Sequence, residues 1–89
     1  MENNYKQSAK VGQEMILTYL KKRMKEKKVT QEQLCKTLKI GRTTLIRYFK
    51  QETEMPNIIY LEICGILELR PYLIPKEMDT TEMHRIFFN

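Results

Sequence analysis

The sequence predicts an all-α fold, a compact bundle of about five short helices in one domain. Apolar residues recur at the three- and four-residue spacing of helices, and no segment shows the alternation typical of a strand. The chain has 89 residues, 42% of them hydrophobic and 30% charged. A chain of this length buries only roughly 60 to 65% of its unfolded surface, so we expect one small core. We expect a polar N-terminal arm over residues 1–7, the main domain over residues 8–75, and a C-terminal segment suited to dimerisation over residues 76–89.

The first helix is predicted from Ser8 to Lys27. Its inward stripe comprises Ile16, Leu20 and Met24, flanked by Val11, Leu17 and Tyr19. The opposite face carries six basic residues close together: Lys21, Lys22, Arg23, Lys25, Lys27 and Lys28. By default these charges only solvate the helix, but the last few lie near enough to the following segment to contact phosphates.

The second helix has the clearest start signal in the chain. Thr30 is placed to cap the amide of Gln33, whose side chain can reach back, while Val29 can pack on Leu34. Leu34, Cys35 and Leu38 are then expected to face inward. The pattern predicts a short helix that begins next to Thr30.

A turn at residues 39–41 leads into a third short helix that begins at Gly41 or Arg42. Its buried side is predicted to hold Leu45, Tyr48 and Phe49. The opposite side is predicted to hold Thr43, Ile46, Arg47 and Lys50. Two short helices joined by a tight turn, with basic residues exposed on the second, are typical of a helix-turn-helix that reads DNA.

Residues 51–56 form a predicted loop, and Pro56 with Asn57 starts a fourth helix. Residues 58–69 are apolar on nearly every side, so we expect this helix in the middle of the core. Gly65 suggests a close approach of another helix. A last short helix is predicted where Asp79 and Glu82 have capping-box spacing, with an apolar face of Met83, Ile86 and Phe87. This end either folds back on its own domain or pairs with a second copy, and we favour pairing.

Charge is divided unevenly along the chain. Residues 1–50 hold thirteen Lys or Arg against four acidic residues, a net +9, whereas residues 51–89 hold three against seven, a net −4. Clustered positive charge is what phosphate neutralisation with counterion release requires. The alternative is a solvated lysine-rich helix without a ligand.

Several function classes are disfavoured. The single histidine, His84, has no nucleophile, paired carboxylates or metal-ligand spacing near it, so we expect no enzyme, no metal site and no cofactor. Cys35 and Cys64 are far apart and fit small buried hydrophobes of a reducing cytoplasm. No apolar run approaches the roughly 18 residues of a spanning helix, so we expect no membrane association. Aromatic residues follow the core pattern rather than an exposed stacking face, which disfavours single-stranded RNA binding.

The chain resembles the lambda-repressor-like helix-turn-helix domains, which include the Cro and Xre-type regulators of phages and bacteria. The resemblance covers about residues 16–74, and the matching positions are Thr30, Gln31, Leu34, Cys35, Ile40, Leu45, Pro56, Ile63, Cys64 and Leu67. Two features depart from the family pattern: Lys39 stands where glycine is usual, and the loop before the fourth helix carries Glu52 and Glu54 where the family is often basic.

In that family, the first residue of the second helix and the opening residues of the third approach DNA. The resemblance therefore implies a phosphate contact for Gln31 and base contacts for Arg42, Thr43 and Arg47, the same third-helix residues that the helical face singles out. Ile46 is either a singly exposed aliphatic residue or a contact to a thymine methyl group. Further phosphate contacts are expected from three residues: Lys22, Thr44 and Lys50.

The sequence thus predicts a sequence-specific regulator of double-stranded DNA, most simply a phage- or bacterial-type repressor. We expect it to bind as a homodimer in the cytoplasm, at the nucleoid when bound to DNA. The alternative is the antitoxin of a toxin-antitoxin pair, in which the apolar tail or the acidic half binds a toxin.

Overall fold

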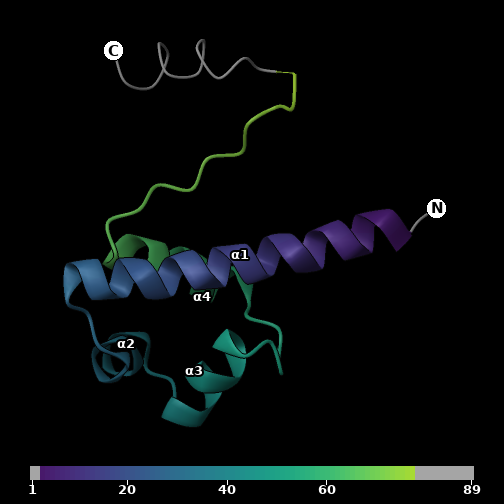
Figure 1. Ribbon diagram of the computed structural model, residues 1–89. Helices are drawn as coiled ribbons and strands as arrows, with labels where there is room; N and C mark the ends of the chain where they lie inside the picture. Colours follow the sequence, from purple (N-terminus) through teal and green to yellow (C-terminus); the bar gives the residue numbers. More distant parts are fainter. Residues whose placement is uncertain (1–2, 78–89) are drawn as a thin grey trace, which may run out of the picture.

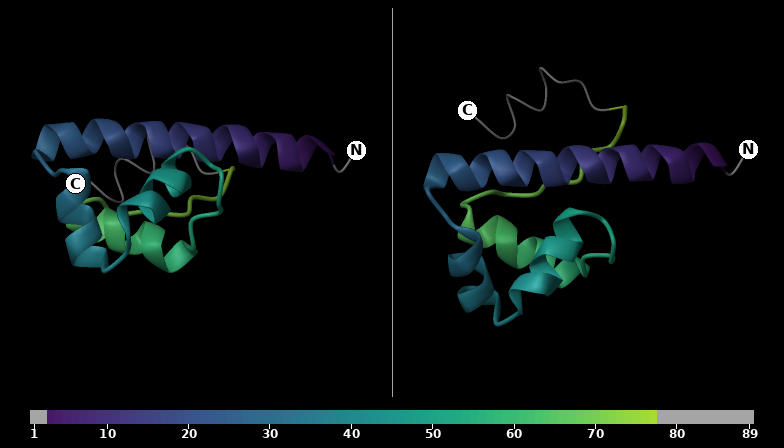
Figure 2. Two further views of the ribbon diagram at one scale, coloured as in Figure 1. Left: turned by 90° about the horizontal axis from the view of Figure 1, so that it is seen from below. Right: turned by 60° about the horizontal axis from the view of Figure 1, so that its bottom comes forward.

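The computed structural model describes residues 3–77, and every regular element in that range is a helix (Figure 1). Helix α1 spans Asn3–Lys27, α2 spans Gln31–Leu38, α3 spans Arg42–Phe49 and α4 spans Asn57–Ile66. The long α1 lies across one side of the group formed by the three short helices, as the two further views in Figure 2 also show. The predicted all-α class is therefore confirmed for the described residues. The predicted last helix lies in residues 78–89, outside them.

One apolar cluster joins the four helices of the described region. Five side chains in it are at most 1% exposed: Leu20, Leu34, Leu45, Ile63 and Leu67. Leu17, Met24, Leu38 and Phe49 complete the cluster. Cys64 is buried and Cys35 is half-buried, and both are free thiols. Each short helix therefore contributes its apolar side to the same core.

Helix α1 differs from the prediction in its start and in its buried face. It begins at Asn3, so residues 3–7 are helical rather than an arm. No proline or glycine interrupts this polar segment, and its side chains tolerate the solvent-exposed surface of a helix. Leu17, Leu20 and Met24 are buried, but Ile16 remains 44% exposed and Tyr19 49% exposed. The apolar stripe of α1 is wider than its contact with the core, so the outer part of the stripe stays about half exposed within residues 3–77.

Helix α4 is also less central than predicted. It buries Ile63 and Cys64, whereas Ile58 is 68% exposed and Leu61 is 46% exposed. The three other helices cover only one side of α4, so its apolar composition exceeds its burial. The close approach expected at Gly65 was wrong, because a Cβ atom there would meet nothing within 4 Å.

The predicted start of α2 is confirmed in detail. The Thr30 hydroxyl accepts a bond from the Gln33 amide at 3.1 Å, and the Gln33 side chain accepts one from the Thr30 amide at 2.8 Å. Val29 is half-buried against the core, where a hydrophobic staple belongs. This reciprocal cap satisfies two amides at the start of an eight-residue helix.

Four described residues other than glycine have positive φ, and each lies just after a helix: Lys28, Lys39, Gln51 and Glu68. Lys39, with φ 58° and ψ 46°, closes α2 in the left-handed conformation. Gly41, by contrast, is extended at φ −75° and ψ 157° and precedes α3. The left-handed residue of the turn is therefore at the position where the resembled family has glycine, although here that residue is a lysine.

The left-handed conformation of Lys39 should affect the stability of the protein. Lys39→Gly should raise the free energy of unfolding by about 0.5 kcal/mol, because glycine removes the steric cost of positive φ and loses only part of that gain to its freer unfolded state. Urea unfolding followed by circular dichroism measures this change. The matched control, Lys36→Gly within α2, should lower the free energy of unfolding by about 1 kcal/mol. A loss of stability in both variants would contradict the assignment of the turn.

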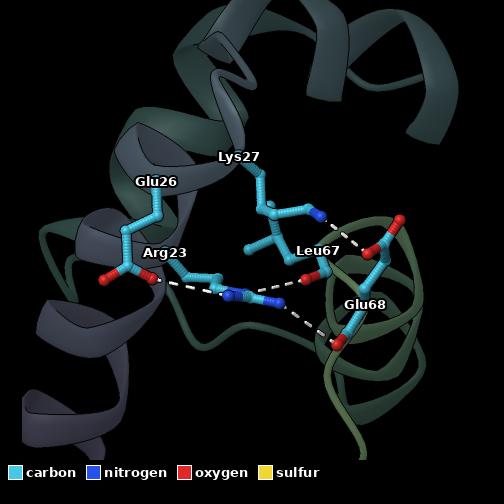
Figure 3. A network of polar contacts seen from close by, with 5 residues as sticks. All are labelled: Arg23, Glu26, Lys27, Leu67 and Glu68. Carbon is cyan, nitrogen blue, oxygen red and sulfur yellow. Dashed lines mark hydrogen bonds and ion pairs between the residues drawn. The ribbon is translucent and has the colours of Figure 1, made fainter.

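Basic residues of α1 hold the end of α4 (Figure 3). Arg23 Nε donates to the Leu67 carbonyl at 3.0 Å, and Arg23 Nη2 donates to the Glu68 carbonyl at 3.5 Å. Lys27 Nζ contacts Glu68 Oε1 at 2.6 Å, and Arg23 also pairs with Glu26 at 3.5 Å. Carbonyls at the end of a helix lack intrahelical partners, so Arg23 both satisfies them and fixes the place where the chain leaves α4.

The contact with Lys27 should be visible in the titration of Glu68. The hydrogen bond from Lys27, together with its charge, lowers the pKa of Glu68 below its usual value. Since the folded-state pKa is the lower one, the pair stabilises the fold above the unfolded-state pKa, and this contribution is lost as the pH falls through the folded-state pKa. NMR titration of the Glu68 carboxyl should show the low pKa, and Lys27→Met should raise it toward the usual value. Equal pKa values in both proteins would contradict the contact.

Candidate nucleic-acid interface

The side of α3 opposite its buried residues is polar and basic. Leu45 and Phe49 enter the core, and three residues on the other side are exposed: Thr43, Arg47 and Lys50. Arg42 and Thr44, in the first turn of the helix, are exposed as well. We call the group Arg42, Thr43, Arg47 and Lys50 the α3 outer face. The exposure predicted for these residues is confirmed.

Two residues of α3 lie between the core and the α3 outer face. Ile46 and Tyr48 are both half-buried. Ile46 was expected on the exposed side and Tyr48 on the buried side. Ile46 is therefore more buried than predicted, and Tyr48 is more exposed than predicted. The neighbouring α2 packs along α3 and covers part of its flank. Ile46 therefore presents only part of its side chain at the edge of the α3 outer face.

The basic residues of the described region fall into two groups. Arg23 and Lys27 are held in ion pairs with Glu26 and Glu68. Within residues 3–77, no ion pair engages Arg42, Arg47 or Lys50. The first turn of α3 contains no acidic residue either. The positive end of the α3 dipole therefore adds to the charge of Arg42, whereas Arg47 lies in the last turn of the helix, at the negative end of the dipole.

A second basic site lies beside the start of α2. A hollow of about 220 Å³ is lined by Lys21, Met24, Lys25, Val29, Gln31 and Phe49. Lys21 Nζ lies 5.9 Å from the centre of the Phe49 ring, within the range of a cation–π contact. The structure thus brings two lysines of α1 next to Gln31, the residue singled out for a phosphate contact.

Lys22 does not belong to this hollow, although the sequence pointed to it. It is exposed on α1 but is not among the residues that line the site around Gln31. The sequence did not single out Lys21, and it placed Lys25 only among the last basic residues of α1 that could contact phosphates. Their four-residue spacing, next to the buried Met24, places both along one border of the inward stripe, and that signal could have identified them.

The two acidic residues of the loop before α4 have different surroundings. Glu54 lines a larger open groove, of about 1020 Å³, that also includes Lys6 and Lys10 from the N-terminal half of α1. Glu52 is exposed, and its amide donates to the Arg47 carbonyl at 3.0 Å. Of the two acids that depart from the family pattern, Glu52 is therefore the one beside the α3 outer face, because its backbone is bonded to that of Arg47.

The described residues contain neither a cluster suited to a metal ion nor a helix suited to cross a membrane. No group of three or more His, Cys, Asp or Glu side chains there could hold a metal ion. None of the described helices combines the length and apolar character needed to cross a bilayer. His84 lies outside the described residues.

Comparisons with known proteins give no relative: no protein-family description, no curated protein and no solved structure matches this chain.

Proposed function

We propose that the protein is a sequence-specific regulator of double-stranded DNA, most simply a repressor. In this proposal α2, the turn at Lys39 and α3 form a helix-turn-helix of the lambda-repressor-like kind. The observation that carries it is the α3 outer face, where Arg42 and Arg47 are exposed without an ion pair within residues 3–77. An exposed basic helix on a rigid core is suited to the major groove, which is about 12 Å wide.

Each residue of the α3 outer face has a role in this proposal. Arg42 and Arg47 donate two hydrogen bonds each to the O6 and N7 atoms of guanine, and Thr43 contacts a base edge or a phosphate. The exposed part of Ile46 contacts a thymine methyl group at the edge of the footprint. Lys50, at the end of α3, contacts the backbone.

The hollow beside α2 supplies the phosphate contacts. Gln31 opens α2, and Lys21 and Lys25 flank it, so a phosphate bound there would meet two ammonium groups and the positive end of a helix. Thr44 and Lys22 remain candidates for further backbone contacts. Such contacts position the protein on the duplex, whereas the α3 side chains select the sequence.

We further propose that two copies act together. Third helices of a homodimer lie in successive major grooves about 34 Å apart, and a promoter covered in this way is closed to transcription without any catalytic residue. The protein would work in the cytoplasm, at the nucleoid. A ligand, a metal and a cofactor have no part in the proposal.

A second candidate function is that of an antitoxin, which binds a protein partner and DNA through the same fold. The observation that favours it is the uncovered apolar surface of α4, where Ile58 and Leu61 are exposed. Co-purification with a small protein from an adjacent gene would support it, provided that Ile58→Gln with Leu61→Gln releases the partner. A partner retained by that variant would speak against this surface.

The base-reading role predicts the effect of Arg47→Ala. Binding to the preferred site, selected from random duplex DNA, should weaken by about 1 to 3 kcal/mol, with relaxed preference at one base pair. Fluorescence anisotropy at fixed salt measures both affinities. Lys10→Ala, which removes an exposed charge far along α1, is the matched control and should change little. Equal losses on preferred and random DNA for Arg47→Ala would refute base reading.

The proposed phosphate contact in the hollow predicts different effects on DNA binding for substitutions of Lys25 and Lys22. Lys25→Ala should weaken binding to preferred and random DNA alike and reduce the salt slope by about one, because one released counterion is lost. Lys22→Ala should have a smaller effect if the hollow around Gln31 holds the phosphate. A larger loss of affinity in Lys22→Ala than in Lys25→Ala would show that the DNA phosphate contacts Lys22 instead of the hollow around Gln31.

A further inference from the structure

An apolar stripe on α1 is only partly covered by the described residues, although two of its members, Gly12 and Ile16, border the groove that also contains Met55 and Tyr60. Tyr5, Gly12, Ile16 and Tyr19 follow one another at spacings of seven, four and three residues, which places them on one face of the helix. Tyr5 is 83% exposed, and Met15, beside this line, is 67% exposed. We call Tyr5, Gly12, Met15, Ile16 and Tyr19 the outer stripe. A surface of this kind on a small domain marks a contact.

The outer stripe ends at the residue that holds the chain as it leaves α4. Arg23 follows Tyr19 by four residues and therefore lies on the same face of α1. Its guanidinium binds the carbonyls of Leu67 and Glu68 (Figure 3). The chain that follows α4 thus starts from one end of the outer stripe.

Residues 70–77 then continue from that end of the outer stripe. In Figure 1 this segment leaves the end of α4 and runs back in the direction of the N-terminal half of α1, on the side of α1 away from α2 and α3; the left view of Figure 2, from below, shows it on the same side of α1 as the short helices. All of its residues are exposed. The segment that follows α4 therefore leaves from the Arg23 end of the outer stripe and runs in the direction of the N-terminal half of α1.

We propose that residues 78–89 of the same chain cover the outer stripe. These twelve residues are MDTTEMHRIFFN, in which the sequence predicts a helix with Met83, Ile86 and Phe87 on one face. As a helix they would extend about 18 Å, close to the roughly 21 Å from Tyr5 to Tyr19. The net charges of the two segments are opposite, since α1 holds seven basic and two acidic residues, whereas residues 78–89 hold two acidic and one basic. Gly12, whose Cβ position is open, leaves room for a large side chain.

The same chain is a better cover than a second copy for two physical reasons. A segment attached beside its site has an effective concentration on the order of millimolar, well above ordinary protein concentrations. The large side chains of the outer stripe offer on the order of 400 Å² per copy, about half of the roughly 800 Å² per partner of a standard interface. The path of residues 70–77 thus reverses the preference for tail pairing that the sequence alone favoured. This inference does not depend on DNA binding.

A double-mutant cycle in the full chain tests the contact. Met15→Gln and Phe87→Gln should each raise the equilibrium constant for unfolding in urea about tenfold. Together they should raise it about tenfold rather than a hundredfold, because either change already releases the cover. Leu61→Gln, which alters an exposed residue of α4, is the control and should add fully to Phe87→Gln. Additive effects of Met15→Gln and Phe87→Gln, or no effect of Phe87→Gln, would overturn the proposal.

A spectroscopic measurement distinguishes the same chain from a second copy. The chain has no tryptophan, so Phe87→Trp places a single indole in the proposed cover. Its emission should be blue-shifted, should move to longer wavelength on adding Met15→Gln, and should be independent of protein concentration from 1 to 100 µM. Emission at the wavelength of a solvated indole, or a blue shift that disappears on dilution together with a dimer in sedimentation, would overturn the proposal. Helical circular dichroism checks that each variant is folded.

Discussion

Each short helix of this protein depends on the burial of its apolar side in one common cluster. Helices of eight or ten residues are not stable alone in water, and α2, α3 and α4 have those lengths. Leu34, Leu45 and Ile63 are all completely buried, one from each of them. Burying Leu45 with Phe49 determines which side of α3 faces solvent. The exposure of Arg42, Thr43 and Arg47 is thus a consequence of core packing.

Helix α1 serves two purposes along its length. Its C-terminal half supplies Leu17, Leu20 and Met24 to the core and holds the end of α4 through Arg23 and Lys27. Its N-terminal half extends past the short helices, and an apolar stripe from Tyr5 to Tyr19 is only partly covered by residues 3–77. Because the same helix borders the hollow at Gln31, changes that tilt α1 would move Lys21 and Lys25 relative to α3. Stability and the candidate interface are coupled through this one element.

Local structure could be predicted from the sequence wherever residues close together in the chain determine it. The capping box of Thr30 and Gln33 requires only residues three apart, and the opposite sides of α3 follow from a period of 3.6 residues. Where contacts between distant residues decide the structure, the sequence-based prediction was wrong. Ile16 and Tyr19 fit an inward stripe as well as Leu17 does, yet only Leu17 is buried. Likewise, the apolar residues of α4 are more numerous than the neighbours available to bury them, so Ile58 and Leu61 remain exposed.

The sequence by itself determined the all-α class, the start of α2, the sides of α3 and the concentration of basic charge in residues 1–50, because each depends on composition or on short-range spacing. Only the tertiary structure decided which border of α1 faces Gln31, where the chain leaves α4, and which apolar residues stay uncovered. Those features depend on the angles at which helices meet, and these follow from the fit of side chains far apart in the sequence.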